Sequence, residues 1–373
     1  MLPMRTTPPF RADHVGSLLR PATVLTARDD FAAGRIDADQ LRAVEDKAIA
    51  DVVAMQQNVG LQTATDGEFR RASWHMDFIY QIGGISKAPG TMAVRFHNPS
   101  GDIEWTPAAL HVGTKLHMAK TIFEQDFTYL KSLAGASTAK LTIPSPNMVH
   151  YRGGPAAIDP AVYPDIEEFW SDLSAAYADE VARLAALGCT YLQFDDTSLA
   201  YLNDPSQRAE IEGRGEDAEH LHLRYIRQVN DALAAKPAGM TVTTHLCRGN
   251  FRSSWAASGG YDFVAEALFG ELKVDGFFLE YDDERSGGFE PLRFVPPGKM
   301  VVLGLVTTKR GELESADTLK RRIEEASAYV PLDQLCLSPQ CGFSSTVEGN
   351  VLSYDQEVAK LELIVKVAQD VWG

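Results

Sequence analysis

Four side chains in the second half of the chain have the types and the spacing of a metal site. A histidine and a cysteine stand two residues apart in the run TTHLC, as His245 and Cys247, while Glu280 and Cys341 close two later apolar runs. Alternate residues of a β-strand point to the same face, so this imidazole and this thiolate can reach one ion. One nitrogen, two sulfurs and one carboxylate oxygen suit tetrahedral Zn²⁺ better than Mg²⁺ or Ca²⁺. Taken alone, the His-x-Cys pair is explained slightly better as a buried core pair.

The other two cysteines, Cys189 and Cys336, lie inside apolar runs and are expected to be inert core residues. Four cysteines in 373 residues are too few for a disulfide scaffold. In a reducing compartment, each cysteine therefore serves either packing or chemistry.

Eight apolar, β-rich segments alternate with segments of helical spacing. The expected strands span 11–17, 61–68, 139–146, 189–196, 240–247, 276–282, 300–308 and 334–341. Helical spacing runs from Ile166 to Leu187, closed by Gly188, and recurs near 39–58, 217–235, 260–269, 314–328 and 354–370. Eight parallel strands separated by helices predict an α/β fold, a single (β/α)8 TIM barrel over residues 1–373. In that fold the chemistry sits at the C-terminal ends of the strands, where the four candidate ligands stand.

One stretch, 83–133, is too long for a single crossover helix and is rich in glycine, proline and aromatic residues. It predicts a segment inserted after the second strand, with a hairpin near the barrel mouth. This segment is the candidate lid.

Composition narrows the class of protein. Hydrophobic residues make up 45% and charged residues 23%, values typical of a folded globular chain. The formal charge of -16 repels phosphate backbones and anionic lipid, which argues against a nucleic-acid or membrane partner. The sequence contains no apolar run of a signal peptide or of a membrane span, so a cytoplasmic location is expected.

Six motifs, in order along nearly the whole chain, resemble the cobalamin-independent methionine synthase family. They are FRADHVGSLLRP at 10–21, DGEFRR at 66–71, LQFDD at 192–196, THLCRGNF at 244–251, LEYDD at 279–283 and SPQCGF at 338–343. The resemblance implies a zinc enzyme that activates a thiol, with the four residues named above as its ligands. The chain looks like a short, single-barrel member that corresponds to the catalytic half of the two-barrel enzymes.

A zinc site with two thiolates and a carboxylate carries a net charge of about -1. Such a site is poor at activating water and good at holding an electron-rich substrate thiolate, which would otherwise be protonated below its pKa of about 8.5. The resemblance implies that the thiol of homocysteine, or of a similar small substrate, displaces Glu280 and then attacks an electrophilic carbon.

The resemblance also implies a pocket for the amino-acid part of that substrate. The backbone N–H groups of Gly16 and Ser17 would take a carboxylate, and Glu68 and Asp195 would pair with an ammonium group. The alternatives are structural: Glu68 pairs with a nearby arginine, and Asp195 caps the helix that follows it.

Three further residues, His14, Asp196 and Lys309, are candidates for a catalytic role. A histidine beside a strand end is more often structural, and Asp196 is also placed to cap a helix. Lys309, in GLVTTKRGE at 304–312, aligns with a histidine that the family uses near the methyl donor. An aromatic wall over a flat substrate, or simply core packing, is expected of Trp74, His75 and Phe78.

The sequence leaves the alkyl donor open, because the family's histidine and its third-strand tryptophan are both missing. The expected partners are a small thiol and an alkyl donor, either a folate, methylcobalamin or another compound. The leading hypothesis is a zinc-dependent S-methyltransferase. The alternatives are transfer of another alkyl group, such as an opened epoxide, to coenzyme M or another thiol, a zinc hydrolase, and a non-catalytic thiol- or metal-binding protein.

Overall fold

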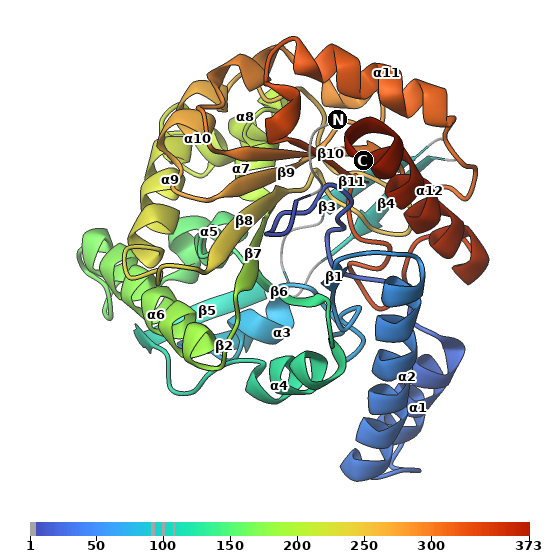
Figure 1. Cartoon of the computed structure of the whole chain (residues 1–373). Coiled ribbons are helices and arrows are strands. Elements are labelled where there is room, and N and C mark those ends of the chain that lie inside the picture. The colour runs from blue at the N-terminus through green and yellow to red at the C-terminus, as the bar shows by residue number, and fades with distance from the viewer. Residues whose placement is uncertain (1–4, 91–93, 99–100, 107–108) are drawn as a thin grey trace.

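The computed structural model describes residues 5–90, 94–98, 101–106 and 109–373. Seven parallel strands form a curled half-barrel, and their order in the sheet follows their order along the chain (Figure 1). In sheet order they are β1 (Thr63–Ala64), β6 (Thr138–Pro144), β7 (Tyr191–Asp196), β8 (Thr241–Leu246), β9 (Gly276–Glu280), β10 (Met300–Val306) and β11 (Leu335–Pro339). This confirms the α/β fold and its likeness to a TIM barrel.

The first expected strand, 11–17, does not form a strand. Ala12 makes one parallel bridge with Leu337 of β11, and Gly16 then adopts a φ of +147°. A Cβ at Gly16 would lie 2.7 Å from a methyl carbon of Thr142, so only glycine fits this bend. Beyond the bend, the carbonyl of Gly16 accepts a hydrogen bond from the hydroxyl of Thr65 at 2.7 Å. The segment therefore spans the gap between β11 and β1 through isolated bonds, and the complete eight-stranded barrel that we predicted is formed only in part.

Helices pack around the outside of the sheet (Figure 1). Their bounds are α1 (Ala22–Ala32), α2 (Ala38–Asn58), α3 (Met76–Ile79), α4 (Glu124–Leu133), α5 (Asn147–Tyr151), α6 (Ile166–Ala186), α7 (Ser198–Tyr201), α8 (Pro205–Gly213), α9 (Leu221–Ala232), α10 (Ala265–Glu271), α11 (Ala316–Ser327) and α12 (Tyr354–Trp372). Four 3₁₀ turns, η1 (Gly154–Ala157), η2 (Glu284–Ser286), η3 (Glu290–Phe294) and η4 (Leu332–Gln334), complete the described elements. Within the described residues, no helix has both the length and the apolar character that crossing a membrane requires.

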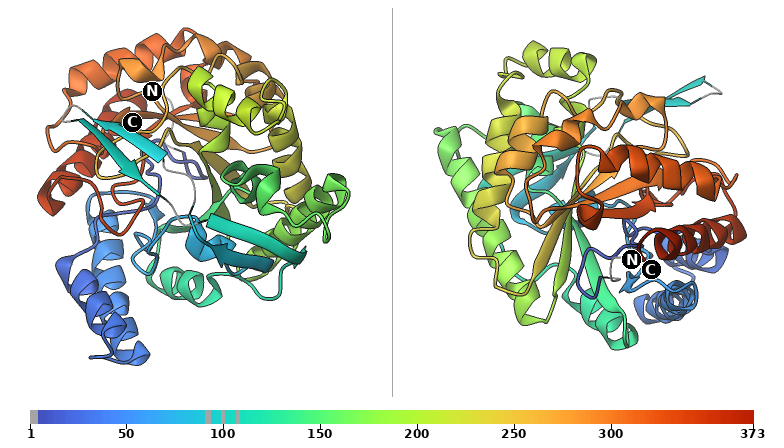
Figure 2. Two further views of the ribbon diagram at one scale, coloured as in Figure 1. Left: turned by 180° about the vertical axis from the view of Figure 1, so that it is seen from behind. Right: turned by 45° about the horizontal axis from the view of Figure 1, so that its top comes forward.

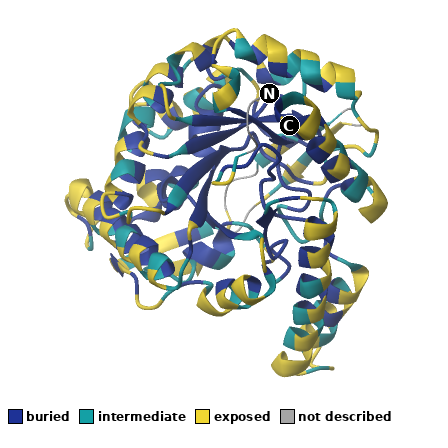
Figure 3. Cartoon of the chain, viewed as in Figure 1, coloured by how far each residue is buried: buried dark blue, intermediate teal, exposed yellow. Residues whose placement is uncertain are grey.

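Local sequence explains where the long helices start and stop. Asp37 and Ser353 begin α2 and α12 with capping boxes, and the Asp165 side chain accepts the backbone N–H of Glu167 at the start of α6. Gly188 follows α6 with a φ of +88°, as expected for a glycine that ends a helix. The strands are buried along almost their whole length, and exposed residues lie on the outer faces of the helices (Figure 3).

Between β1 and β6 the chain forms two small antiparallel sheets. One pairs β2 (Gly83–Ala88) with β5 (Ala109–His117), and the other is the hairpin of β3 (Val94–Asn98) and β4 (Gly101–Trp105). Figure 2 shows this hairpin, in cyan, extending over one end of the half-barrel. The two sheets and α4 occupy the stretch that the sequence marked as an insertion, and its role as a lid stays a prediction.

Candidate metal centre and its cavity

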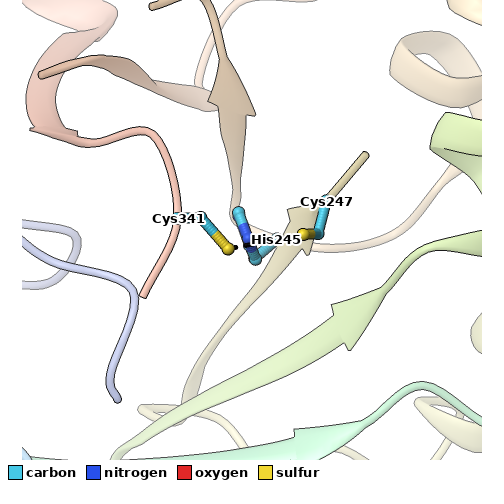
Figure 4. A group of neighbouring side chains, drawn as sticks. All are labelled: His245, Cys247 and Cys341. Atoms are coloured by element: carbon cyan, nitrogen blue, oxygen red, sulfur yellow. Dashed lines mark hydrogen bonds between the residues drawn. The ribbon is translucent and has the colours of Figure 1, made fainter. Parts of the chain in front are cut away.

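Three of the four predicted metal ligands converge at the C-terminal ends of two strands. His245 lies at the end of β8 and Cys247 directly follows that strand, while Cys341 comes just after β11. One donor atom from each lies within 4.8 Å of the others, and all three side chains are buried (Figure 4). The two sulfurs are 3.3 Å apart. The His-x-Cys pattern thus places both side chains on one side, as the alternation along a strand predicts.

The donors fit a zinc ion in both chemistry and hydrogen bonding. Both ring nitrogens of His245 are buried and have no hydrogen-bond partner within the described residues. Buried polar atoms rarely stay without a partner, and an imidazole nitrogen beside two sulfurs is a normal zinc ligand. A hydrogen bond from Cys247 and the neighbouring imidazole lower the pKa of Cys341 well below its ordinary value despite burial. That same bond raises the pKa of Cys247 well above its ordinary value.

Glu280, the fourth predicted ligand, lies at the end of β9 and is fully buried, but it falls outside the group of three donors. Its carboxylate is surrounded by cations: Arg248 and Arg285 each approach Oε2 at 3.7 Å, and Lys309 approaches Oε1 at 3.9 Å. The backbone N–H of Arg248 also donates to Oε2 at 3.0 Å. These charges stabilise a carboxylate that does not depend on a metal, and its role as a ligand stays a prediction.

The three donors line a cavity of about 50 Å³. This volume holds a few water molecules or a short side chain, and it is far smaller than a folate. Three aromatic side chains line the cavity, and we call them its roof. Trp105 of the β3–β4 hairpin stacks on Phe251 with ring centroids 5.2 Å apart, and the ring of Phe96 lies 5.3 Å from that of Phe251. The hairpin is fixed to the chain after β8 by backbone hydrogen bonds in both directions between His97 and Trp255, at 2.7 and 3.0 Å.

Two of the predicted substrate residues, Glu68 and Asp195, line the same cavity. The Oε1 of Glu68 accepts from the hydroxyl of Thr142 at 2.7 Å and lies 3.5 Å from Arg71, while its Oε2 is buried with no partner in the described chain. Burial raises the pKa of Asp195 to about 7, and the charge of Glu68 adds to this effect. Glu68 therefore keeps one buried oxygen that a cationic group of a ligand would satisfy. The alternative for Glu68, a pair with an arginine, holds for only one of its two oxygens.

Ser17 also lines the cavity, next to Gly16 at the bend described above. Their backbone N–H groups donate no hydrogen bond to any other described residue. Glu68 itself has a φ of 61°, a left-handed conformation that is strained for a residue with a side chain. Such strain is concentrated where a chain positions functional groups.

The three candidate catalytic residues lie outside the cavity lining. His14 is buried beside Lys140, whose ammonium donates to the His14 carbonyl at 2.6 Å, and burial lowers the pKa of His14 to about 4. Asp196 accepts from Asn147, Ser198 and the backbone N–H of Leu199 at 2.7 to 2.9 Å. These hydrogen bonds agree with the structural alternative for Asp196, because they organise the start of α7.

Lys309 pairs with Asp282 at 3.5 Å as well as with Glu280. The structure thus places it in the charged cluster behind the three donors. It is not among the residues that face the cavity.

Several lining residues carried no sequence signal. Arg152 reaches the cavity from directly after α5, Tyr201 from the last position of α7, and Phe251 from the chain after β8. Of the expected aromatic wall, Trp74 and His75 do line the cavity, whereas Phe78 is fully buried against Phe123 and Tyr177. The hairpin aromatics are identifiable only once the fold brings the insertion over the strand ends.

A parallel half-barrel with soft donors at its strand ends defines a class, that of barrel proteins with a thiolate-rich metal centre. The model of the family described as "Cobalamin-independent synthase, Catalytic domain" matches residues 10–370. The chain belongs to this family, whose members are zinc methyltransferases.

Individual relatives agree with this placement. The chain is 47% identical over 365 residues to the uncharacterized protein YxjH of Bacillus subtilis (strain 168), covering 98% of this chain and 95% of that one. It is 23% identical to a methionine synthase of Pyrococcus abyssi, covering 88% and 84%. A solved structure of a provisionally assigned vitamin-B12-independent methionine synthase from Listeria monocytogenes is 38% identical, covers 99% and 100%, and has a TM-score of 0.78.

Proposed function

We propose that this protein is a zinc-dependent thiol alkyltransferase that methylates homocysteine or a similar small amino thiol. One observation carries the proposal: His245, Cys247 and Cys341 line the same small cavity as the carboxylates of Glu68 and Asp195, and Oε2 of Glu68 has no partner in the described chain. Soft donors suit a metal that binds sulfur, and the carboxylates suit an ammonium group on the same substrate.

His245, Cys247 and Cys341 would hold the zinc ion, with Glu280 as the fourth ligand. When bound, zinc lowers the pKa of a substrate thiol and keeps its sulfur nucleophilic at neutral pH. The cations around Glu280, 3.7 to 3.9 Å from its carboxylate, would balance its charge whether or not it holds the ion.

The chain's other residues would position the substrate. Glu68 and Asp195 pair with its ammonium group, and the free N–H groups of Gly16 and Ser17 take its carboxylate. The aromatic roof excludes water, which strengthens each of these interactions and protects the alkyl donor from hydrolysis.

The same cavity bears on the alternatives. Coenzyme M carries a sulfonate and no ammonium group, so it would leave Glu68 and Asp195 without a cationic partner on the substrate. Hydrolysis requires a metal site that makes water acidic, and two thiolates work against this. A non-catalytic thiol-binding protein would not need the enclosed roof. The amino thiol is the substrate that the charges favour.

A matrix of substrates tests the proposal. Zinc-loaded protein is incubated with homocysteine, coenzyme M or glutathione, each combined with a methyl-folate, methylcobalamin or an epoxide, and thioethers are measured by mass spectrometry. We expect homocysteine to be the preferred acceptor and expect Glu68→Gln to reduce this preference. Thioether formation at the uncatalysed rate in every combination, with zinc present, would overturn the proposal.

A further inference from the structure

His75 lines the cavity beside the metal donors, yet nothing in the proposed chemistry so far uses it. It directly precedes α3 and is only 3% exposed. Its ring lies beside that of Trp74, with centroids 4.4 Å apart, which fixes its orientation from one side. A buried, polar group in the wall of a reaction cavity is a candidate for contact with a ligand.

The hydrogen bonds around His75 bear on which of its ring nitrogens carries the proton. The backbone N–H of Met76 donates to the hydroxyl oxygen of Ser73 at 3.3 Å, and that oxygen lies 3.1 Å from Nδ1 of His75. No other protein acceptor for the hydroxyl proton of Ser73 lies within hydrogen-bond distance in the described chain. We assign the hydroxyl proton to Nδ1, which in a neutral imidazole puts the ring proton on Nε2. Burial, and after it the charge of Arg152, lower the pKa of His75 to about 3, so the ring is neutral.

The Nε2–H group is left without an acceptor. Nε2 is buried and has no hydrogen-bond partner among the described residues. A buried group without a hydrogen bond is unfavourable, and a ligand with an acceptor atom would satisfy it. Arg152 lines the same cavity, its Nε also lacks a partner, and it forms no ion pair with any described carboxylate. The cavity thus has a wall of donors and positive charge in addition to its acidic residues.

We propose that His75 Nε2–H donates a hydrogen bond to the leaving atom of the alkyl donor, with Arg152 supplying positive charge beside it. The inference rests on the proposed alkyl transfer. In that step the substrate sulfur forms a bond to the alkyl carbon, the bond from this carbon to the leaving atom breaks, and the leaving atom keeps the electron pair. His75 and Arg152 stabilise the negative charge that develops there and keep their own protons. The leaving group departs as an anion and takes a proton from water after its release.

This arrangement selects a chemical class of donor. It favours donors whose leaving atom is an oxygen that gains negative charge, because a fixed donor aimed at a developing charge lowers the barrier. It disfavours cationic donors such as sulfonium ions, because Arg152 repels their charge and their leaving group departs neutral.

Nuclear magnetic resonance tests the contact without depending on turnover. The full chain is prepared with ¹⁵N-labelled histidine rings, and the His75 signal is assigned by its loss in His75→Gln. We expect a neutral ring protonated at Nε2, whose resonance shifts when toluenesulfonate, a released leaving group, is added. A proton on Nδ1 would overturn the inference. So would a shift caused by homocysteine alone and not by the sulfonate, since His75 would then bind the carboxylate of the thiol.

Kinetics with methyl arenesulfonates of differing leaving-group pKa test the role in transfer. His75→Phe keeps an aromatic ring but removes the N–H group that donates the hydrogen bond, whereas His75→Gln keeps an N–H group. We expect His75→Phe to lose about 100-fold in kcat and to depend more steeply on leaving-group pKa, and expect His75→Gln to lose less than tenfold. Bound zinc should be unchanged in both. Wild-type rates and slope in His75→Phe would overturn the inference, whereas zinc-free wild-type protein would overturn the proposed function instead.

Discussion

The sulfur atoms of Cys247 and Cys341 lie 3.3 Å apart, although 94 residues separate them in the chain. Each cysteine follows a parallel strand of one curled sheet, so the fold brings two distant strand ends to one point. Their hydrogen bond lowers the pKa of Cys341 and raises that of Cys247, so Cys341 is the stronger acid of the two. A thiolate held ready beside an imidazole is the starting point for binding a metal.

Replacing Cys341 should remove the metal. We expect Cys341→Ser to weaken zinc binding by more than about 100-fold, because a ligand is lost and not merely an outer partner. Cys189→Ser is the matched control: Cys189 is buried and bonds to the carbonyl of Tyr191 at 3.5 Å, away from the cavity. Zinc titration against a chromophoric chelator measures both. Equal zinc affinity in the two variants would contradict the assignment of Cys341.

Two variants can separate the role of Glu280 in zinc binding from that of its charged neighbours. We expect Glu280→Gln to weaken zinc binding by about 100-fold and Asp282→Asn to weaken it by less than tenfold. Asp282 is a fair control because it shares Lys309 and Arg285 with Glu280, at 3.5 and 3.3 Å, and is not a predicted ligand. The same chelator titration applies. If both variants bind zinc equally well, Glu280 is only a counter-ion for the surrounding cations.

The hairpin roof should determine how large an alkyl group the cavity accepts. We expect Trp105→Ala, which removes the ring stacked on Phe251, to raise kcat/KM for a benzyl donor relative to a methyl donor by about tenfold or more. Phe31→Ala, on the exposed end of α1, serves as a control that should leave this ratio unchanged. Competition between the two donors measures the ratio directly. An unchanged ratio in Trp105→Ala would show that the hairpin does not limit the donor.

Stability should depend on pH through Glu357, a residue far from the chemistry. Burial raises its pKa to about 8, while its Oε1 accepts the backbone N–H of Leu19 at 2.9 Å. Between its unfolded pKa and 8 the folded chain binds more protons than the unfolded chain, so the free energy of unfolding falls as pH rises. We expect Glu357→Gln to match wild type near pH 5 and to melt about 2–4 °C higher near pH 9.

Thermal melting across this pH range is the measurement, and the exposed Glu362→Gln on the same helix is the control. Equal melting temperatures for Glu357→Gln and wild type at pH 9 would show that this carboxyl does not carry the pH dependence.

The sequence predicted the strands best where burial is continuous. The run 189–196 became β7 (Tyr191–Asp196), because a fully buried parallel strand appears as an unbroken apolar segment. The prediction for 11–17 was wrong in detail because the sequence pattern does not show that Gly16 bends the chain against Thr142. Hydrophobic pattern reports burial, whereas this bend depends on a contact with a residue more than a hundred positions away.

The residues of the candidate site also differ in whether the sequence could predict them. His245 and Cys247 were predictable because the period of a strand sets their relation. Arg285 beside Glu280 and Arg152 in the cavity wall were not, since they reach the site from segments that have no period. Asp196 illustrates the opposite case: its type suggested chemistry, but its hydrogen bonds assign it to the start of a helix.

X-ray absorption at the zinc K-edge, recorded on the full chain before and after homocysteine is added, tests the central claim that this cavity holds zinc and presents it to a thiol. The free protein should show two sulfur scatterers, from Cys247 and Cys341, with nitrogen or oxygen scatterers completing the shell. Homocysteine should add a third sulfur and remove one oxygen. A zinc shell that stays the same when homocysteine is bound would contradict the account.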